Sequence, residues 1–247
     1  PAISTMIRGL FLPEENEQWA SIDFDQQEPR ILVHYANLTK RGLTGSRSFV
    51  GAYRTDPQTD FHQMVGEICS IPRSQAKTIN LALMYGMGQT RLAEQLDVST
   101  EEAKRLMAQY HTDVPFVKEL QEMVQRRVSD KDGNGFIRSL LGRKCRFDLW
   151  EPNLFVSSRA LQKEQALIEY GDNIKRAYTY KSANRLIQAS AADMTKAAMV
   201  AVHEEHGATP LVQIHDELAF SVEDQKEAKI ICSVMEEAVK LEVPTPC

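Results

Sequence analysis

The sequence lacks long apolar segments, paired cysteines and an excess of positive charge. No run of eighteen or more apolar residues occurs among its 247 residues, which excludes a transmembrane helix and a membrane partner. Its four cysteines lie far apart with no Cys-x-x-Cys pair, so structural zinc is not expected and a reducing cytoplasm fits. The net charge of −5 does not indicate nucleic-acid binding, although local patches decide that rather than the total.

An initiator Met, a signal peptide, internal repeats and low-complexity tracts are also missing. Because the chain begins at Pro1, we expect a processed or excised piece of a longer protein. Its apolar fraction of 43% is ordinary for a globular protein and is enough for a sizeable core in one or two domains.

Residues 73–88 carry the most informative pattern. Pro72 precedes them, and proline is tolerated in the first turn of a helix. Gly86 or Gly88 can adopt the left-handed conformation that ends a helix, so one helix is predicted here. Cations, an apolar residue and a tyrosine recur in it every four residues, at Arg73, Lys77, Leu81 and Tyr85.

Such a spacing places the four side chains in one row on the helix surface. In order, they would match the phosphates, sugar and base of a nucleoside triphosphate, and the helix dipole favours phosphate at the same end. A solvated helix face with scattered cations is the alternative that the spacing alone leaves open.

Two segments far apart in the sequence offer carboxylates. Residues 19–25 alternate as a β-strand does, with apolar side chains on one side and Asp23 and Asp25 on the other. Two short apolar runs flank Asp216 and Glu217, which predicts a β-hairpin with the acids at its tip. Either set could face water, but Mg²⁺ prefers such oxygen ligands, and two ions roughly 3.5–4 Å apart support in-line displacement at phosphorus. Together with cations on a helix, the acids predict phosphoryl or nucleotidyl transfer.

The other segments are predicted mainly as helices. A capping box at residues 99–102 begins one of them, and His62 is expected to face solvent unless it belongs to a site. Four cations around Gly142 suit either solvent or a nucleic-acid backbone. We expect an arm at 1–18, loops at 39–59, a hairpin at 136–147, and helices at 31–38, 60–68, 99–110, 115–128, 161–183, 190–206 and 223–241.

Three segments in this order resemble the motifs of family A (bacterial polymerase I-like) DNA polymerases, of a phage type. Residues 23–30 are similar to the first motif, Arg73-(x)3-Lys77-(x)7-Tyr85-Gly86 to the second, and residues 213–217 to the third. The resemblance covers nearly the whole chain and corresponds to the palm and fingers portion. Further matches are Asp60-x-His62, Leu141-Gly-Arg143 and Gln188-(x)3-Ala192-Asp193.

The resemblance implies an α+β fold with an antiparallel palm sheet, helices and a mostly helical fingers subdomain. The palm would comprise residues 1–38 and 185–247, and the fingers residues 39–184. The thumb and the proofreading exonuclease would precede Pro1, and a closing palm strand would follow Cys247, so all three are expected outside this chain.

The implied activity is template-directed addition of dNMP to a primer 3′ end with release of pyrophosphate. Asp23, Asp216 and the Phe24 carbonyl would bind two Mg²⁺ ions, with Mn²⁺ as a substitute, and Glu217 would support them. Primer–template DNA and dNTPs would be the partners, with a processivity factor or the thumb and exonuclease of a longer parent. The setting would be the cytoplasm, that of the host cell if the protein is viral.

Roles around the nucleotide are implied by the same resemblance. Arg73, Lys77 and His62 would grip the triphosphate, and Lys77 would be catalytic. Tyr85 and Glu28 would pair beneath the sugar, where Glu28 would block a 2′-hydroxyl.

The DNA contacts are implied in the same way. Gln26 would lie beside the incoming nucleotide or its base pair. Arg185, Gln188 and His215 would lie along the primer–template. Closure of the helix over a correct pair would assemble the site.

Two departures from the family pattern stand in the first motif. Asp25 replaces a small polar residue and is either an extra carboxylate near the metals or a spectator that points aside. Pro29 replaces a leucine and is expected to bend the exit of the strand, because it removes a backbone donor.

Three other functions remain open on the sequence alone. A single-subunit RNA polymerase shares the arrangement of Asp, Lys, Tyr and His-Asp, although Glu28 argues against it. A His-Asp metal phosphohydrolase would need more histidine ligands than the His203-x-x-His206 pair supplies. A catalytically silent nucleic-acid-binding fragment is the third.

Leu81 stands where the family usually has Phe or Tyr against the sugar, which changes stacking on the nucleotide. We therefore expect dideoxynucleotides to be poor substrates. A primer-extension competition between ddNTP and dNTP measures this, and equal use of the two would contradict it.

Overall fold

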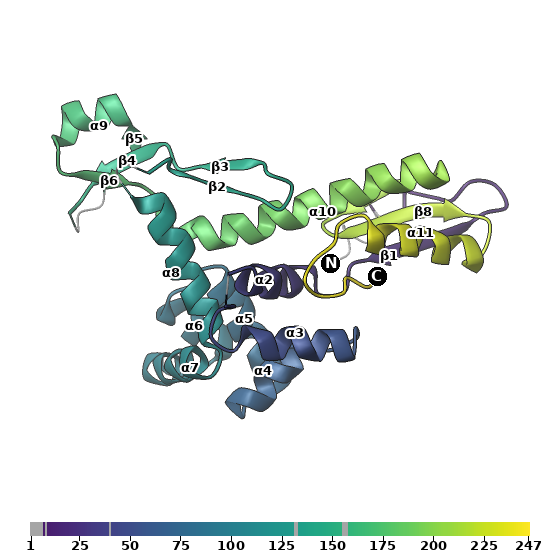
Figure 1. Ribbon diagram of the computed structural model, residues 1–247, viewed down its shortest axis with the longest axis horizontal. Helices are drawn as coiled ribbons and strands as arrows, with labels where there is room; N and C mark the ends of the chain where they lie inside the picture. Colours follow the sequence, from purple (N-terminus) through teal and green to yellow (C-terminus); the bar gives the residue numbers. More distant parts are fainter. Residues whose placement is uncertain (1–6, 8, 40, 131–132, 155–157) are drawn as a thin grey trace.

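The computed structural model describes residues 7, 9–39, 41–130, 133–154 and 158–247 (Figure 1). It is a mixed α+β fold with small antiparallel sheets. The strands are β1 (Gln18–Asp23), β2 (Phe136–Arg138), β3 (Lys144–Arg146), β4 (Leu149–Pro152), β5 (Leu161–Gln162), β6 (Ile174–Arg176), β7 (Val212–Ile214) and β8 (Glu217–Val222).

Helices make up most of the rest, and none of those described is long and apolar enough to cross a membrane. They are α2 (Gln27–Asn37), α3 (Ser46–Thr55), α4 (Phe61–Cys69), α5 (Arg73–Met84), α6 (Gln89–Leu96), α7 (Thr100–Asp113), α8 (Pro115–Ser129), α9 (Lys163–Tyr170), the 3₁₀ turn η1 (Thr179–Lys181), α10 (Ser182–His206) and α11 (Gln225–Glu237).

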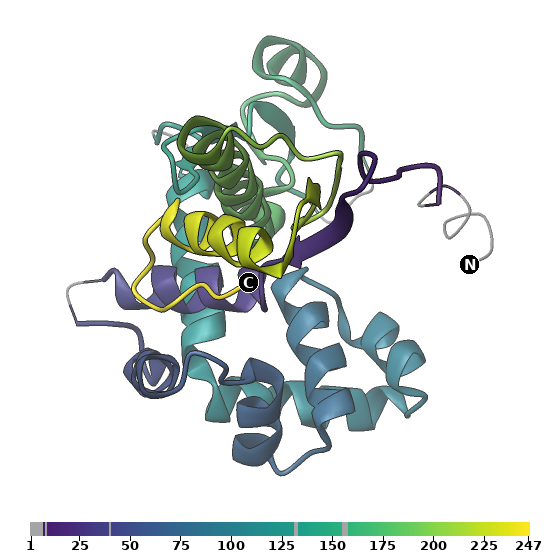
Figure 2. The same ribbon diagram turned by 90° about the vertical axis from the view of Figure 1, so that its right-hand side faces the viewer.

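One three-stranded sheet has the strand order β1-β8-β7. The predicted alternation along β1 is confirmed, because Ile22 and Phe24 are buried while Asp23 is exposed. α11 packs against β1 and β8, and α10 packs against both α11 and α2. Figure 2 shows α10 and α11 on one side of β1 and the blue helices of the α3–α6 region below it.

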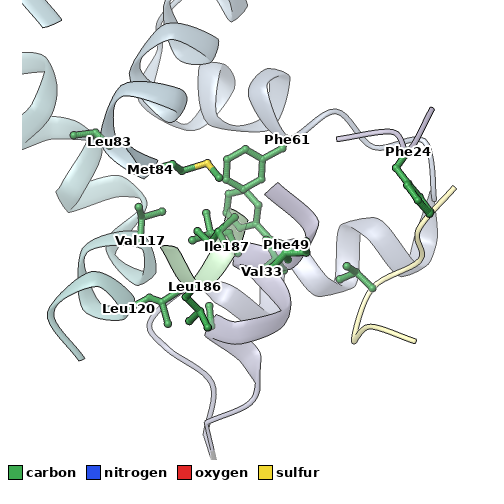
Figure 3. Close-up of a cluster of buried hydrophobic side chains, with 14 of the residues drawn as sticks. Phe24, Val33, Phe49, Phe61, Leu83, Met84, Val117, Leu120, Leu186 and Ile187 are labelled. Carbon is green, nitrogen blue, oxygen red and sulfur yellow. The ribbon is translucent and has the colours of Figure 1, made fainter. Parts of the chain in front are cut away.

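One continuous apolar core joins this sheet to the helical lobe of α3–α8 (Figure 3). Phe49 and Phe61 pack at a ring separation of 5.2 Å, and Phe49 and Phe116 at 5.1 Å. α5 buries Ala76 and Ile79 completely in this core. Those side chains form its inner face, so the opposite face of α5 is left toward solvent.

The expectation of loops over residues 39–59 was wrong, because α3 lies there. Phe49, Val50 and Tyr53 form its buried stripe. The glycines and serines around them favour turns when the segment is considered alone. The helix forms because its apolar side chains pack in the core against residues distant in sequence.

The predicted helix at 161–183 was correct only in part: α9 lies there and α10 begins at its end, but β5, β6 and η1 interrupt it in a small appendage. There β4 pairs with both β5 and β6, and α9 covers them over a separate cluster centred on Trp150. Figure 1 shows this appendage beyond the β2–β3 hairpin. β5 and β6 form strands here because each pairs with β4, a contact that the local sequence pattern does not contain.

Pro29 does not bend the strand exit. α2 begins at Gln27, so Pro29 lies in its first turn, where a missing N–H has no intrahelical partner. The turn out of β1 is made instead by Gln26, whose φ of 50° is left-handed. α10 likewise begins earlier than expected, at Ser182, and α11 ends earlier, at Glu237.

Arg30 is fully buried and joins three segments at this turn. It donates to the Asp25 carboxylate at 2.6 Å and to the carbonyls of Asp25, Pro57 and Pro244 at 2.7 to 2.9 Å. Its guanidinium also lies 4.4 Å from the centre of the Tyr53 ring. Asp25 therefore pairs with Arg30, although its charge still contributes to the raised pKa of Asp23.

We expect Arg30→Met to lower the free energy of unfolding by about 3–5 kcal/mol, because Asp25 and three carbonyls lose a buried partner. Urea unfolding measures this. The matched control is Arg54→Met, whose ion pair with Glu242 is largely exposed and should cost no more than about 1 kcal/mol. Equal losses in the two variants would contradict the anchoring role.

Candidate active site

Three carboxylates meet at one end of the β1-β8-β7 sheet. Asp23 ends β1 directly opposite Glu217, which begins β8, and Asp216 precedes Glu217 in the β7–β8 turn. Asp23 and Asp216 lie within hydrogen-bond reach of each other. The predicted pairing of the two aspartates is thus confirmed.

The β7–β8 turn holds Asp216 at the tip of a tight hairpin. Ile214 pairs with Glu217, so only His215 and Asp216 connect the strands. His215 has a φ of 58°, which non-glycine residues rarely adopt, and its carbonyl accepts a 3.0 Å hydrogen bond from Gln213 Nε2. The short connection leaves Asp216 little freedom to move away from Asp23.

The mutual proximity of the acids perturbs their titration. The pKa of Asp23 is raised to about 6, first by burial and then by the charges of Asp216 and Glu217. Glu217 also accepts a hydrogen bond from Ser21 Oγ. A cluster of carboxylate oxygens is the donor set that a hard divalent cation takes, so these residues fit such an ion. Phe24, buried directly after Asp23, fixes the backbone beside them.

The predicted row on α5 is confirmed as one helix face, with Tyr85 immediately after the last helical residue. Lys77 is exposed, and it has no ion pair with any described residue. Arg73 is engaged: its Nε and Nη2 lie 2.7 and 2.5 Å from Asp60 Oδ2. Leu81, which follows the two cations in the row and precedes Tyr85, is half-buried.

Asp60 contacts the first residue of this row, and the sequence indicated it only as part of a motif. Its Oδ1 caps α4 by accepting from the backbone N–H groups of His62 and Gln63, and its Oδ2 holds Arg73. An Asp directly before an apolar helical pattern signals the cap. The contact between Asp60 and Arg73 could not be predicted from the sequence, because it depends on how α4 and α5 pack together.

His62 is buried, so the expectation that it faces solvent was wrong. Its Nδ1 lies 2.8 Å from the Asn80 amide nitrogen on α5, which can only donate. Burial lowers the pKa of His62, and Asp60, Arg73 and Lys77 are among the charges that act on it. The ring is therefore neutral near pH 7 and lies close to the two cations of the row.

A cleft of about 430 Å³ lies beside the acids. At its wall the Tyr85 hydroxyl donates to Glu28 at 2.8 and 3.0 Å from the two carboxylate oxygens, which confirms their pairing. Burial and Glu28 raise the pKa of Tyr85 to about 12, so the phenol stays protonated. The lining residues are Gln27, Glu28, Tyr85, Gln188, Ala191, Ala192, Thr195, Gln213, His215 and Asp216.

The remaining predicted residues fall into two groups. Gln188 and His215 line the cleft, and Gln188 lies within hydrogen-bond reach of Tyr85. Arg185 lies on the exposed side of α10 and donates to the Arg146 carbonyl. Gln26 does not line the cleft, because its amide bridges Asp25 and the Phe61 N–H, joining β1 to α4.

Comparison with known proteins decides which family has this arrangement. The family model described as DNA polymerase family A matches residues 2–247. The chain belongs to DNA polymerase family A. Membership implies the use of a divalent metal ion.

Individual family A proteins show how far the likeness extends. A DNA-directed DNA polymerase of Pseudomonas phage M6 is 35% identical over 97% of this chain and 38% of its own length. The thermostable DNA polymerase I of Thermus aquaticus is 27% identical over 96% of this chain and 27% of its own length. The chain thus spans less than two fifths of these relatives.

A solved structure supports the same family A fold. The POL domain of Pol1 from M. smegmatis, in complex with DNA primer-template and dNTP, superposes with a TM-score of 0.70 at 28% identity. The match covers 96% of this chain and 40% of that one. The expected α+β fold is confirmed, and so is the resemblance to phage polymerases.

The raised pKa of Asp23 predicts that the free energy of unfolding depends on pH. The folded state holds this proton more tightly than the unfolded chain, so the contribution to stability is complete below about pH 4 and is lost as pH rises through about 6. Without divalent metal, Asp23→Asn should raise the free energy of unfolding at pH 7.5 by on the order of 1 kcal/mol after solvent screening.

At pH 4 the same substitution should change little, and Mg²⁺ should stabilise only the wild-type chain. Urea unfolding at both pH values measures this. Asp172→Asn, an exposed carboxylate in the appendage, is the control and should be neutral throughout. A stabilisation of Asp23→Asn that is the same at both pH values would count against the explanation.

Proposed function

We propose that this chain is the catalytic core of a DNA-directed DNA polymerase that adds dNMP to a primer 3′ end and releases pyrophosphate. The observation that carries the proposal is the convergence of Asp23 and Asp216 beside the Glu28–Tyr85 pair in a family A chain. Neither a phosphohydrolase nor a passive binding module needs the Glu28–Tyr85 pair beside the two aspartates.

Asp23, Asp216 and the Phe24 carbonyl would hold two Mg²⁺ ions, or Mn²⁺ in their place, with Glu217 in support. When bound, the ions would lower the pKa of the attacking hydroxyl and neutralise charge on the transferred phosphoryl group. The perturbed titration of Asp23 supports this role, because a site built for cations leaves its carboxylates in mutual repulsion when alone.

The exposed row of α5 would bind the triphosphate. Lys77, which is free of ion pairs with the described residues, is the first cation available to it, and would also serve catalysis. Arg73 would exchange Asp60 for a phosphate oxygen, and neutral His62 would donate from Nε2. The movement of α5 that brings these groups over the acids would complete the site only around a correct pair.

Sugar selection would take place at Glu28 and Tyr85. The hydroxyl of Tyr85 fixes both oxygens of Glu28, so the carboxylate forms a rigid wall of the cleft. A 2′-hydroxyl that meets this wall would clash or lose its hydrogen bonds. Leu81 would touch the sugar from the α5 side.

Primer–template DNA would run along α10 to the cleft. Gln188 and His215 would contact its terminus or minor groove, and Arg185 its backbone. Gln26 would lie beside the incoming nucleotide and keep β1 joined to α4. The palm would be residues 1–38 and 185–247, and the fingers 39–184. The helix α10 begins at Ser182, so this division falls within its first turn.

We expect Asp216→Asn to abolish Mg²⁺-dependent extension of a primer–template by one dNMP. Gel analysis of the extended primer measures this, with Asp172→Asn as the control that keeps wild-type extension. Extension that persists in Asp216→Asn would remove the metal role, and no extension by the wild-type chain would favour a silent nucleic-acid-binding fragment.

We expect Glu28→Ala to lower discrimination against rNTPs by at least about tenfold, because the carboxylate wall is removed. Single-nucleotide insertion with dNTP and with rNTP gives the ratio. Tyr85→Phe is the matched variant: it loses the hydroxyl contacts but keeps the ring and Glu28, so its ratio should change less. Efficient rNTP use by the wild-type chain would favour an RNA polymerase.

A further inference from the structure

Two exposed tyrosines lie at the short turn η1, which precedes α10: Tyr178 comes directly before the turn and Tyr180 lies within it. Tyr178 is 39% exposed and Tyr180 is 59% exposed. Tyr178 has a φ of 59°, a conformation that is unusual for a bulky residue. Within the described parts of the chain, the only partner of either side chain is Lys181. These rings therefore contribute little to the core.

Lys181 places a cation beside both rings. Its Nζ lies 5.2 Å from the ring centre of Tyr178 and 5.6 Å from that of Tyr180. It has no carboxylate partner among the described residues. The turn thus presents two aromatic surfaces and one uncompensated positive charge to solvent, next to the positive end of the α10 dipole.

This cluster lies next to the proposed nucleotide site. Gly86 directly follows Tyr85, and a Cβ added to Gly86 would lie 3.9 Å from the Tyr180 carbonyl oxygen. Lys181, directly before α10, and Arg185 and Gln188 on α10 are all exposed and follow one another at helical spacing. With a rise of 1.5 Å per residue, about 10 Å separates Lys181 from Gln188 in the cleft. Figure 1 shows α10 running from the top of α8 toward the sheet.

Aromatic rings beside a cation are the usual means of binding single-stranded nucleic acid. Each base presents a π-face, so stacking tolerates any sequence, while the cation meets the backbone. Bases in a duplex are already stacked on both sides, which leaves the unpaired strand as the ligand. In a primer–template, that strand is the template ahead of the primer terminus.

We propose that Tyr178, Tyr180 and Lys181 form a platform that stacks the unpaired template bases next to the active site. This inference rests on the proposed polymerase function, since that function supplies the strand. The platform would limit the positions open to the template before its next base pairs. Removal of either ring would then weaken binding in proportion to the length of unpaired template.

The test uses a primer–template with 2-aminopurine, a base whose emission falls on stacking, at the second or third unpaired template position. Binding of the wild-type chain should quench it. Tyr180→Ala and Tyr178→Ala should restore emission and weaken affinity for a long overhang by about tenfold. Affinity for a single-nucleotide overhang should fall much less, and Tyr180→Phe should retain the quenching.

The charge is tested by Lys181→Met, with Lys240→Met, an exposed lysine in the segment that follows α11, as the control. Loss of one backbone contact should reduce the slope of log affinity against log salt by about 0.7 for Lys181→Met alone. The platform would be overturned if both alanine variants still quenched the emission. It would also be overturned if affinity fell equally for long and short overhangs and Tyr180→Phe behaved like Tyr180→Ala.

A failure of the polymerase function is separable from a failure of the platform. Extension of the single-nucleotide overhang by the wild-type chain reports on the function, because it needs no stacked template. Quenching and overhang dependence report on the platform and need no chemistry. Extension without the overhang effect therefore rejects only the platform, and the reverse result rejects only the polymerase.

Discussion

The whole arrangement depends on the antiparallel pairing of β1 with β8. That register sets Asp23 against Glu217, and the two-residue turn before β8 places Asp216 beside both. Three carboxylates held so close repel one another, as the raised pKa of Asp23 records. The ladder of hydrogen bonds and the buried face of β1 hold the three acids together against this repulsion.

Arg30 and Gln26 carry this rigidity from the sheet to the helical lobe. Arg30 ties the strand exit to the segments around Pro57 and Pro244, and Gln26 ties it to the start of α4. At that start, Asp60 both caps α4 and holds Arg73 of α5. A continuous set of polar contacts thus links β1, which carries Asp23, to Arg73, the first residue of the exposed row on α5. The Asp60–Arg73 contact therefore lies where α4 meets the first turn of α5.

The predictable parts were those coded by short, local patterns. β1 alternates strictly, α5 is framed by proline and glycine, and the final hairpin has its acids between two apolar runs, so all three were predicted where they occur. α3 and the β4–β6 appendage were missed, because Phe49 and Trp150 are stabilised by partners distant in sequence. His62 was placed wrongly for the same reason: its helix was correct, but Asn80 on another helix decided that it is buried.

The sequence by itself determined the types of residue and their order: two acids on separate strands, a row of four on one helix, and an ordered set of motifs specific enough to identify family A. Those features follow from spacing along a strand or a helix, which local geometry fixes. Only the tertiary structure decided which charges are free. Asp25 is turned to Arg30, Arg73 is held by Asp60 and Lys77 is left exposed, because each depends on a partner that packing, and not spacing, brings within reach.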